Sequence, residues 1–225
     1  MTGTSTRRLA VVVLLGALCI GSSAPAAAQA PARAGTRPAF SAQVRPIDDA
    51  LAARMRWSWR PGCPVPLSGL RYVTLSYRDF QGRPRTGELV VRRALAPAVV
   101  SAFHRLWDLG FPIKRMRLVD DYRGSDEASM RANNTSAFNC RAVTGGSGWS
   151  QHSYGRAVDI NPVQNPYVVR GTVDPPAGAR YVARSPLRRG MLTPAARRAF
   201  TSLGWGWGGS WRSLKDYMHF SSNNR

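Results

Sequence analysis

The spacing of apolar residues predicts a strand pair in the first half of the chain. Residues 70–77 and 88–92 are rich in β-branched and other apolar residues with polar residues between them, as strands are. The segment between them, 79–84, contains glycine and proline, which favour a turn. Residues 113–119 alternate charged and apolar side chains, as a half-buried edge strand does. We therefore expect a hairpin and a further strand.

Two longer segments have the period of an amphipathic helix. Residues 98–109 place apolar side chains on one face, and glycine follows directly. Residues 194–203 predict a second helix that stops at Gly204, and residues 48–57 predict a short one. Because strands and helices are mixed without a regular βαβ alternation, the pattern indicates the α+β class.

The composition of successive segments predicts that the chain has three parts. Residues 1–28 have the parts of a secretory signal peptide: two arginines, a 12-residue apolar run and a row of alanines. Twelve apolar residues are too few to span a bilayer as a helix, although a retained membrane anchor is the alternative. Residues 29–60 form an Ala/Pro/Arg-rich linker and N-terminal extension, with order expected from about Pro46. Residues 61–225 form the folded domain.

Export changes what the cysteines mean. Signal cleavage would remove Cys19 and leave Cys63 and Cys140, an even number in an oxidising compartment, so we expect a disulfide between them. Closing a loop of this size stabilises a fold by about 4.5 kcal/mol in the chain-entropy model. A two-cysteine metal site is the alternative, but no CxxC spacing supports it.

Two short segments concentrate the residues that carry chemistry. In the first, His152 and Asp159 lie seven positions apart around a glycine and an alanine. The alternation of residues 158–160 predicts a strand that buries its apolar side chains and presents Asp159 on the other face. The second segment holds Asp216 and His219. Together they offer two imidazoles and two carboxylates.

Two imidazoles and a carboxylate suit a catalytic zinc site, which keeps a fourth position for water. His152, Asp159 and His219 would be the ligands, and Asp216 is then placed to accept the proton of that water. The spacing alone leaves open a buried His–Asp hydrogen bond without a metal.

The first of these segments resembles a known family. The run SQHSYGRAVD at residues 150–159 matches the SxHxxGxAxD signature of the M15 metallopeptidases, the D-alanyl-D-alanine carboxypeptidase and dipeptidase group. Asp216-x-x-His219 lies where that family has its acidic-x-x-His motif. The resemblance covers about Leu70 to the C-terminus. It implies a small metallopeptidase domain with a central antiparallel sheet and flanking helices.

The resemblance also implies roles for individual residues. His152, Asp159 and His219 would bind Zn²⁺, and Asp216 would be the general base, one methylene shorter than the Glu of many members. Ser150, the first residue of the signature, is a candidate for substrate binding.

Members of the family also use an upstream arginine to hold the substrate carboxylate or the developing oxyanion. Arg141, next to Cys140, is our first candidate because a disulfide would fix its backbone and so preorganise its charge. Arg123 lies in a Tyr-Arg-Gly-Ser context that resembles the usual one, and it is the second candidate for substrate binding.

Charge and export extend this expectation to a substrate. The chain has 32 Lys and Arg against 12 Asp and Glu, a net charge of +20, which attracts polyanions. An exported protein of this charge would associate with anionic cell-wall polymers, whereas a nucleic-acid partner is not expected. We therefore expect a secreted, wall-associated monomer that hydrolyses peptidoglycan stem peptides as a D-alanyl-D-alanine carboxypeptidase.

Other functions stay open at this stage. An endopeptidase that cuts L-alanyl-D-glutamate is the nearest alternative, and a non-catalytic zinc-containing cell-wall-binding module is another. The tryptophans and glycines of residues 204–211 either form a platform for sugar or peptide or simply pack as a structural loop.

Overall fold

The compact part of the protein begins earlier than the sequence indicates. The computed structural model describes residues 1–4 and 38–224, and it divides the chain into the units Met1–Arg37 and Pro38–Arg225. Most of the expected signal peptide and Cys19 lie outside the described residues. Residues 38–60, assigned above to a linker and extension, belong to the second unit. No helix in the described part of the chain is long and apolar enough to cross a membrane.

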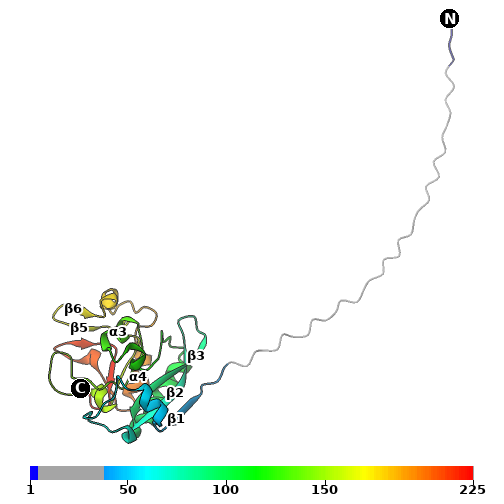
Figure 1. Ribbon diagram of the computed structural model, residues 1–225. Coiled ribbons are helices and arrows are strands. Elements are labelled where there is room, and N and C mark those ends of the chain that lie inside the picture. The colour runs from blue at the N-terminus through cyan, green and yellow to red at the C-terminus, as the bar shows by residue number, and fades with distance from the viewer. Residues whose placement is uncertain (5–37, 225) are drawn as a thin grey trace. The chain divides into compact units, whose positions relative to one another are not determined.

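The expected hairpin is present and has a third strand at its edge. Strand β2 (Leu70–Arg78) pairs antiparallel with β3 (Pro84–Arg92), and β1 (Ala42–Arg45) pairs with the other edge of β2 (Figure 1). In the turn, the carboxylate of Asp79 accepts hydrogen bonds from the backbone N–H groups of Gln81 and Arg83. Strand β1 lies in the segment expected to be a linker, so that expectation was wrong for these residues.

The hairpin is buried on both faces, because alternate side chains enter two different apolar clusters. One set packs against helix α2 (Ala96–Asp108): Val73, Leu75, Leu89 and Val91. The other set packs with Leu51 of helix α1 (Asp49–Arg54) and with Cys140: Leu70, Tyr72 and Val90. The short N-terminal helix therefore covers the second face of the sheet.

Helix α2 links the hairpin to the rest of the unit. Its buried stripe contacts β2 and helix α4 (Pro194–Thr201), and the rings of Phe103 and Phe200 meet edge to face at 5.8 Å. Both helices were expected, and each begins or ends within two residues of the predicted bounds.

Six short strands form two further antiparallel sheets. The first has the order β4 (Ala157–Asp159), β9 (His219–Ser221) and β7 (Gly206–Trp207). The second has the order β6 (Thr172–Asp174), β5 (Tyr167–Val169) and β8 (Lys215–Asp216). The mixture of helices and antiparallel strands confirms the α+β class, but three separate sheets replace the single central sheet that the family resemblance implied.

The strand expected over residues 113–119 does not form. Side-chain amides satisfy backbone groups there that a sheet partner would otherwise bind: Asn161 accepts from the N–H of Lys114, and Asn134 accepts from that of Arg117. The alternation of apolar residues was real, but it lies on an irregular segment whose one isolated bridge joins Met116 to Thr135.

The expected disulfide joins Cys63 to Cys140, with 6.0 Å between their Cα atoms. The backbone N–H of Cys140 donates to the carbonyl of Ser58, and the Arg60 guanidinium donates to the carbonyl of Cys140. The bridge therefore ties the segment after α1 to the chain that follows helix α3 (Asp126–Arg131) and leads to the site described below.

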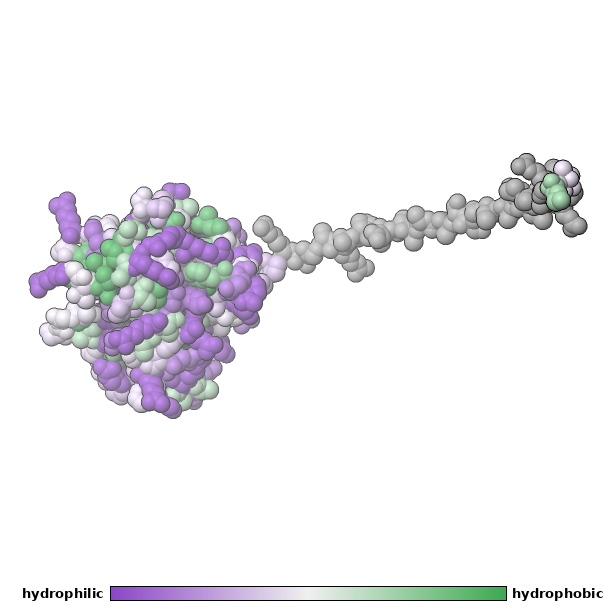
Figure 2. Space-filling model, turned by 90° about the horizontal axis from the view of Figure 1, so that it is seen from above, coloured by the Kyte–Doolittle hydropathy of each residue, from purple (hydrophilic) through white to green (hydrophobic). Residues whose placement is uncertain are grey.

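Figure 2 shows one face of the molecule, where hydrophilic side chains cover most of the surface of the compact part and apolar areas lie between them. A few large apolar side chains of this unit are exposed, among them Val143 and Trp149. Both line the pocket that holds the candidate site.

Candidate active site

The register of one strand pair places two of the expected ligands opposite each other. In the antiparallel pair of β4 and β9, Asp159 lies across from His219, and Val158 lies across from Phe220. Val158 and Phe220 are fully buried in the larger apolar cluster. Because successive side chains of a strand point to opposite faces, Asp159 and His219 turn away from that cluster toward a common place.

His152 reaches the same place from a short helical turn before β4. This 3₁₀ turn, Gln151–Tyr154, begins at Ser150, whose hydroxyl accepts from the N–H of His152, and ends at Gly155. Gly155 has φ +63°, and a Cβ there would lie 2.5 Å from the backbone nitrogen of Arg92. Glycine is therefore required both for the left-handed conformation and for the close approach of strand β3.

The three side chains form a compact, buried cluster. Nε2 of His152 lies 3.1 Å from Oδ2 of Asp159, and Nδ1 of His219 lies 3.1 Å from Oδ1 of the same carboxylate. The three ligand atoms that these residues offer lie within 4.8 Å of one another, and each side chain is at most 7% exposed. This is the donor set of a catalytic zinc site, so the residues present fit a divalent metal.

A hydrogen bond behind His152 fixes which nitrogen faces the cluster. Its Nδ1 lies 2.5 Å from the carbonyl oxygen of Ala137, and a carbonyl can only accept, so Nδ1 carries the proton. Nε2, the ring nitrogen that does not take part in this bond, faces Asp159. Metal-binding histidines are commonly oriented by such a second bond.

Electrostatics keep the central carboxylate ionised. Burial by itself raises the pKa of Asp159, but the charges and hydrogen bonds of His152 and His219 outweigh it and hold that pKa below its usual range. An ionised carboxylate between two imidazoles provides a negative centre for a cation.

Asp216 lies beside this cluster on a different sheet. It belongs to β8, where it pairs with Tyr167 of β5. Its Oδ1 is buried and has no hydrogen-bond partner among the described residues. The pKa of Asp216 is raised to about 7, mainly by burial and also by the charge of Asp159, while His219 and His152 oppose the rise. Such a carboxyl can take up and release a proton near neutral pH.

The cluster and Asp216 open into a pocket of about 500 Å³. Arg141 lines it, where its Nη2 lies 2.7 Å from a carboxylate oxygen of Asp126, and its buried Nε has no partner in the described part of the chain. Ser150 also lines the pocket. Arg123 does not: it is exposed at the end of the 3₁₀ turn Val119–Tyr122. Of the two candidate arginines, the structure brings only Arg141 to the site.

Sequence reasoning missed several walls of the pocket. Asp126, Tyr167 and Asp174 line it from α3, β5 and β6, segments without a recognisable motif. The loop of tryptophans and glycines was noted, and its members separate: Trp205 is buried in the apolar cluster, whereas Trp211 lines the pocket with its ring 5.4 Å from that of His219. The loop therefore contributes both to the apolar cluster and to the wall of the pocket, and its role as a platform for sugar or peptide stays a prediction.

Fold and site together define a small α+β domain with a buried His–Asp–His centre suited to a divalent metal. Residues 144–222, less than half of the chain, match the model of the M15 peptidase family described as D-alanyl-D-alanine carboxypeptidase. This segment contains His152, Asp159, Asp216 and His219, and the match confirms the resemblance to that peptidase family over these residues. The comparisons with curated proteins and with solved structures gave no match.

Proposed function

We propose that this protein is a zinc-dependent peptidase that acts on peptidoglycan stem peptides as a D-alanyl-D-alanine carboxypeptidase. The observation that carries the proposal is the convergence of His152, Asp159 and His219 within 4.8 Å, next to a carboxylate oxygen of Asp216 that has no hydrogen-bond partner in the described part of the chain. The family match at residues 144–222 supports the peptidase part of the proposal.

His152, Asp159 and His219 would hold the metal. Bound Zn²⁺ supplies Lewis-acid activation of a water molecule and of the substrate carbonyl. The carbonyl of Ala137 keeps the imidazole of His152 in the correct orientation and tautomer. The core residues next to Asp159 and His219 fix the two strands, so the donor atoms need little rearrangement on binding.

Asp216 would move the proton. Its buried Oδ1 can accept a proton from the attacking water and pass it to the amine that leaves. A non-catalytic wall-binding module would have no need of this residue, so its position beside the cluster favours hydrolysis over binding alone.

Arg141 would bind the carboxylate at the end of the peptide. Its ion pair with Asp126, the bond from its Nη1 to the carbonyl of Ala142 and the neighbouring disulfide restrict the guanidinium, and its Nε has no partner among the described residues. A terminal carboxylate matches the two-pronged geometry of a guanidinium. This role is what distinguishes a carboxypeptidase from an endopeptidase at this site.

An extracytoplasmic location at the cell wall belongs to the same proposal. The Cys63–Cys140 disulfide is of the kind that persists in oxidising compartments. The net charge of +20 would hold the protein near anionic polymers by a salt-sensitive attraction.

The test uses the purified chain from residue 29 and a stem pentapeptide that ends in D-alanyl-D-alanine. We expect release of the terminal D-alanine, loss of activity on treatment with a chelator, and recovery when Zn²⁺ is added back. Mass analysis of the products identifies the bond: a fragment cut between L-alanine and D-glutamate would replace the carboxypeptidase proposal with the endopeptidase alternative. Hydrolysis that persists after complete metal removal would contradict both.

A further inference from the structure

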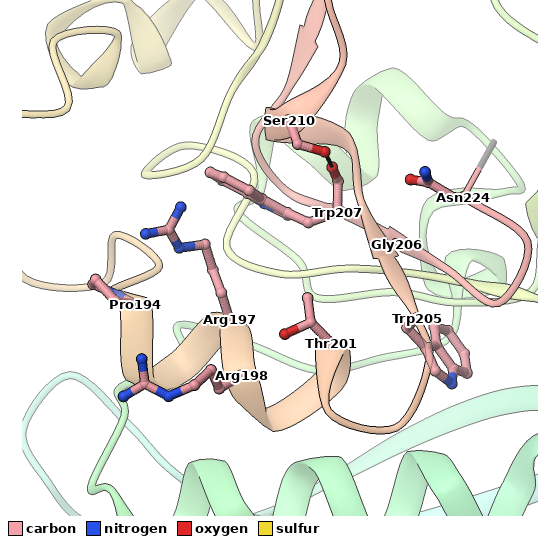
Figure 3. Close-up of a pocket in the computed structure, with 9 residues that line it drawn as sticks. All are labelled: Pro194, Arg197, Arg198, Thr201, Trp205, Gly206, Trp207, Ser210 and Asn224. Carbon is pink, nitrogen blue, oxygen red and sulfur yellow. Dashed lines mark hydrogen bonds between the residues drawn. The ribbon is translucent and has the colours of Figure 1, made fainter.

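A second pocket lies on helix α4 and strand β7, and none of the site residues described above lines it. Its volume is about 420 Å³, and Figure 3 shows nine lining residues: Pro194, Arg197, Arg198, Thr201, Trp205, Gly206, Trp207, Ser210 and Asn224. This set contains two arginines and no carboxylate, in contrast to the pocket with the His–Asp–His cluster, which four aspartates line.

One of the two arginines is held in place by an aromatic ring. The guanidinium of Arg197 lies 4.4 Å from the ring centroid of Trp207, and Figure 3 shows the two side chains next to each other. The indole is fixed in turn, because its Nε1 donates to the carbonyl of Tyr217 at 2.9 Å. The edge of a stacked guanidinium still offers its N–H groups to a ligand.

The positive charge of this surface is not neutralised locally. Arg198 is exposed one position further along α4, and neither it nor Arg197 forms an ion pair with any described residue. A third guanidinium, that of Arg184, lies over the ring of Tyr217 at 4.6 Å, and Tyr217 in turn contacts Trp207. Such a group of unpaired cations creates a potential that attracts anions.

We propose that this pocket, with Arg197 and Arg198 as its two cationic anchors, binds the phosphodiester groups of a linear anionic polymer such as a poly(glycerol phosphate). Two guanidinium groups one residue apart can bind successive phosphates of a flexible chain through paired N–H donors. The site is independent of the proposed hydrolysis, since none of its residues lines the pocket of the His–Asp–His cluster.

A base-containing polymer fits this pocket less well. Proteins that bind single-stranded nucleic acid stack bases on aromatic rings. Here Arg197 covers one face of Trp207, and Gly209 lies so near that a Cβ on it would be 2.2 Å from Cζ2 of the indole. Trp205 is buried and gives no platform either. The pocket offers charge without a free ring, which suits a polymer of phosphates and small alcohols.

The experiment measures binding of the purified protein to poly(glycerol phosphate) over a range of salt concentrations, with oligo(dT) of equal phosphate number as the second ligand. The test variant is R197Q/R198Q. The matched control is R93Q/R189Q, which removes the same charge at two exposed arginines that line neither the catalytic nor the α4 pocket. A third variant, R197K/R198K, keeps the positive charge but removes the paired N–H donors of the planar guanidinium groups.

We expect R197Q/R198Q to weaken polymer binding by about tenfold and to lower the log–log salt slope by about 1.4, the value for two phosphate contacts on a single-stranded chain. The control should lose clearly less, and R197K/R198K should recover part of the affinity. Hydrolysis of a small soluble stem peptide should stay unchanged in all three variants, so that a failure of this proposal is distinguishable from a failure of the proposed function.

Three results would overturn the proposal that this pocket binds a phosphodiester polymer. An equal loss in R93Q/R189Q would show that only net charge matters. Absence of binding by the unaltered protein at low salt would remove the ligand class. Tighter binding of oligo(dT), lost in R197Q/R198Q, would assign the pocket to nucleic acid instead.

Discussion

Residues 38–143 and residues 144–222 differ in what they bury. The first region holds the three-stranded sheet, helix α2, the disulfide and most of the two apolar clusters. The second region has less apolar material but buries His152, Asp159 and His219 next to one another. A group of polar side chains can stay buried and aligned only where a rigid apolar frame holds it. The first region provides that frame, and the second provides the groups that the proposed hydrolysis would use.

The division is not complete, because the first region also reaches into the site. Ala137 orients His152 through its carbonyl, and Arg141 lines the pocket next to the disulfide. The family match begins at residue 144 and leaves both of them out. If the two regions do have these different roles, substitutions in each should separate activity from stability.

The largest effect is expected from Asp216→Asn in the second region. Loss of the proton acceptor should lower kcat by roughly 10²–10⁴-fold. Thermal stability and bound zinc should be retained, because an amide of the same shape replaces a buried carboxylate whose Oδ1 has no hydrogen-bond partner among residues 1–4 and 38–224. Steady-state kinetics, thermal unfolding and metal analysis measure the three quantities.

Asp216→Glu is the matched control, and it should keep much of the activity because the carboxylate remains. Full activity in the asparagine variant would exclude Asp216 as the base. Loss of zinc together with activity would instead make it part of the metal site.

Removal of the disulfide should destabilise the apolar frame formed by residues 38–143. Replacing Cys63 and Cys140 together by serine should lower the free energy of unfolding by about 4 kcal/mol, since the unfolded chain gains the freedom of a large loop. Denaturant unfolding gives this value. We also expect a higher KM for carboxylate-terminated peptides, because the backbone of Arg141 loses its anchor, while zinc still binds.

A folded serine variant that no longer binds zinc would show that the metal site depends on the disulfide, so that the roles of the two regions cannot be separated. An unchanged free energy of unfolding would remove the disulfide from the account of stability.

At the junction of the two regions, Gly155→Ala should destabilise the protein by about 2–3 kcal/mol. A left-handed conformation costs an alanine about 1–2 kcal/mol, and the added Cβ would also press on the backbone of Arg92. Gly82→Ala is a matched control: Gly82 also has a positive φ, but no atom lies within 4 Å of its virtual Cβ. The difference in the free energy of unfolding between the two variants measures the effect of the close contact. Equal destabilisation would mean that strand β3 can shift to accommodate the added Cβ without loss of stability.

The smallest effect belongs to the hairpin turn. Although desolvation raises the pKa of Asp79, hydrogen bonds from the backbone of Arg83 and Gln81 and from the side chains of Arg83 and Arg85 hold it below its usual range. A carboxyl whose pKa is lower in the folded state stabilises the fold above its unfolded pKa of about 4, and this is lost as the pH falls below that value.

Asp79→Asn should therefore lower Tm slightly at pH 7, and the difference from the unaltered protein should shrink on acidification below pH of about 4. Thermal unfolding over a pH series measures this. A difference that stays constant with pH would mean that the turn depends on shape and not on the carboxylate charge. Activity on a small soluble stem peptide at pH 7 should not change.

Local patterns predicted much of the fold, because they depend on neighbours along the chain. The hairpin and helices α2 and α4 follow from apolar spacing and from their turn and capping residues. The strand predicted over residues 113–119 does not form, because side-chain amides from distant segments bind the backbone groups that a strand partner would bind. Strand β1 was missed because its pairing with β2 gives a short, mostly exposed segment its order.

The sequence by itself determined the donor types, the glycine turn that carries His152, and the cysteine pair, since these depend on residue identity and short spacing. Tertiary structure decided the rest. The pairing of β4 with β9 brought together Asp159 and His219, which lie 60 positions apart, and folding selected Arg141 over Arg123 for the pocket. The physical reason is that contacts between distant segments depend on how the apolar clusters pack, and no local pattern of residues encodes that packing alone.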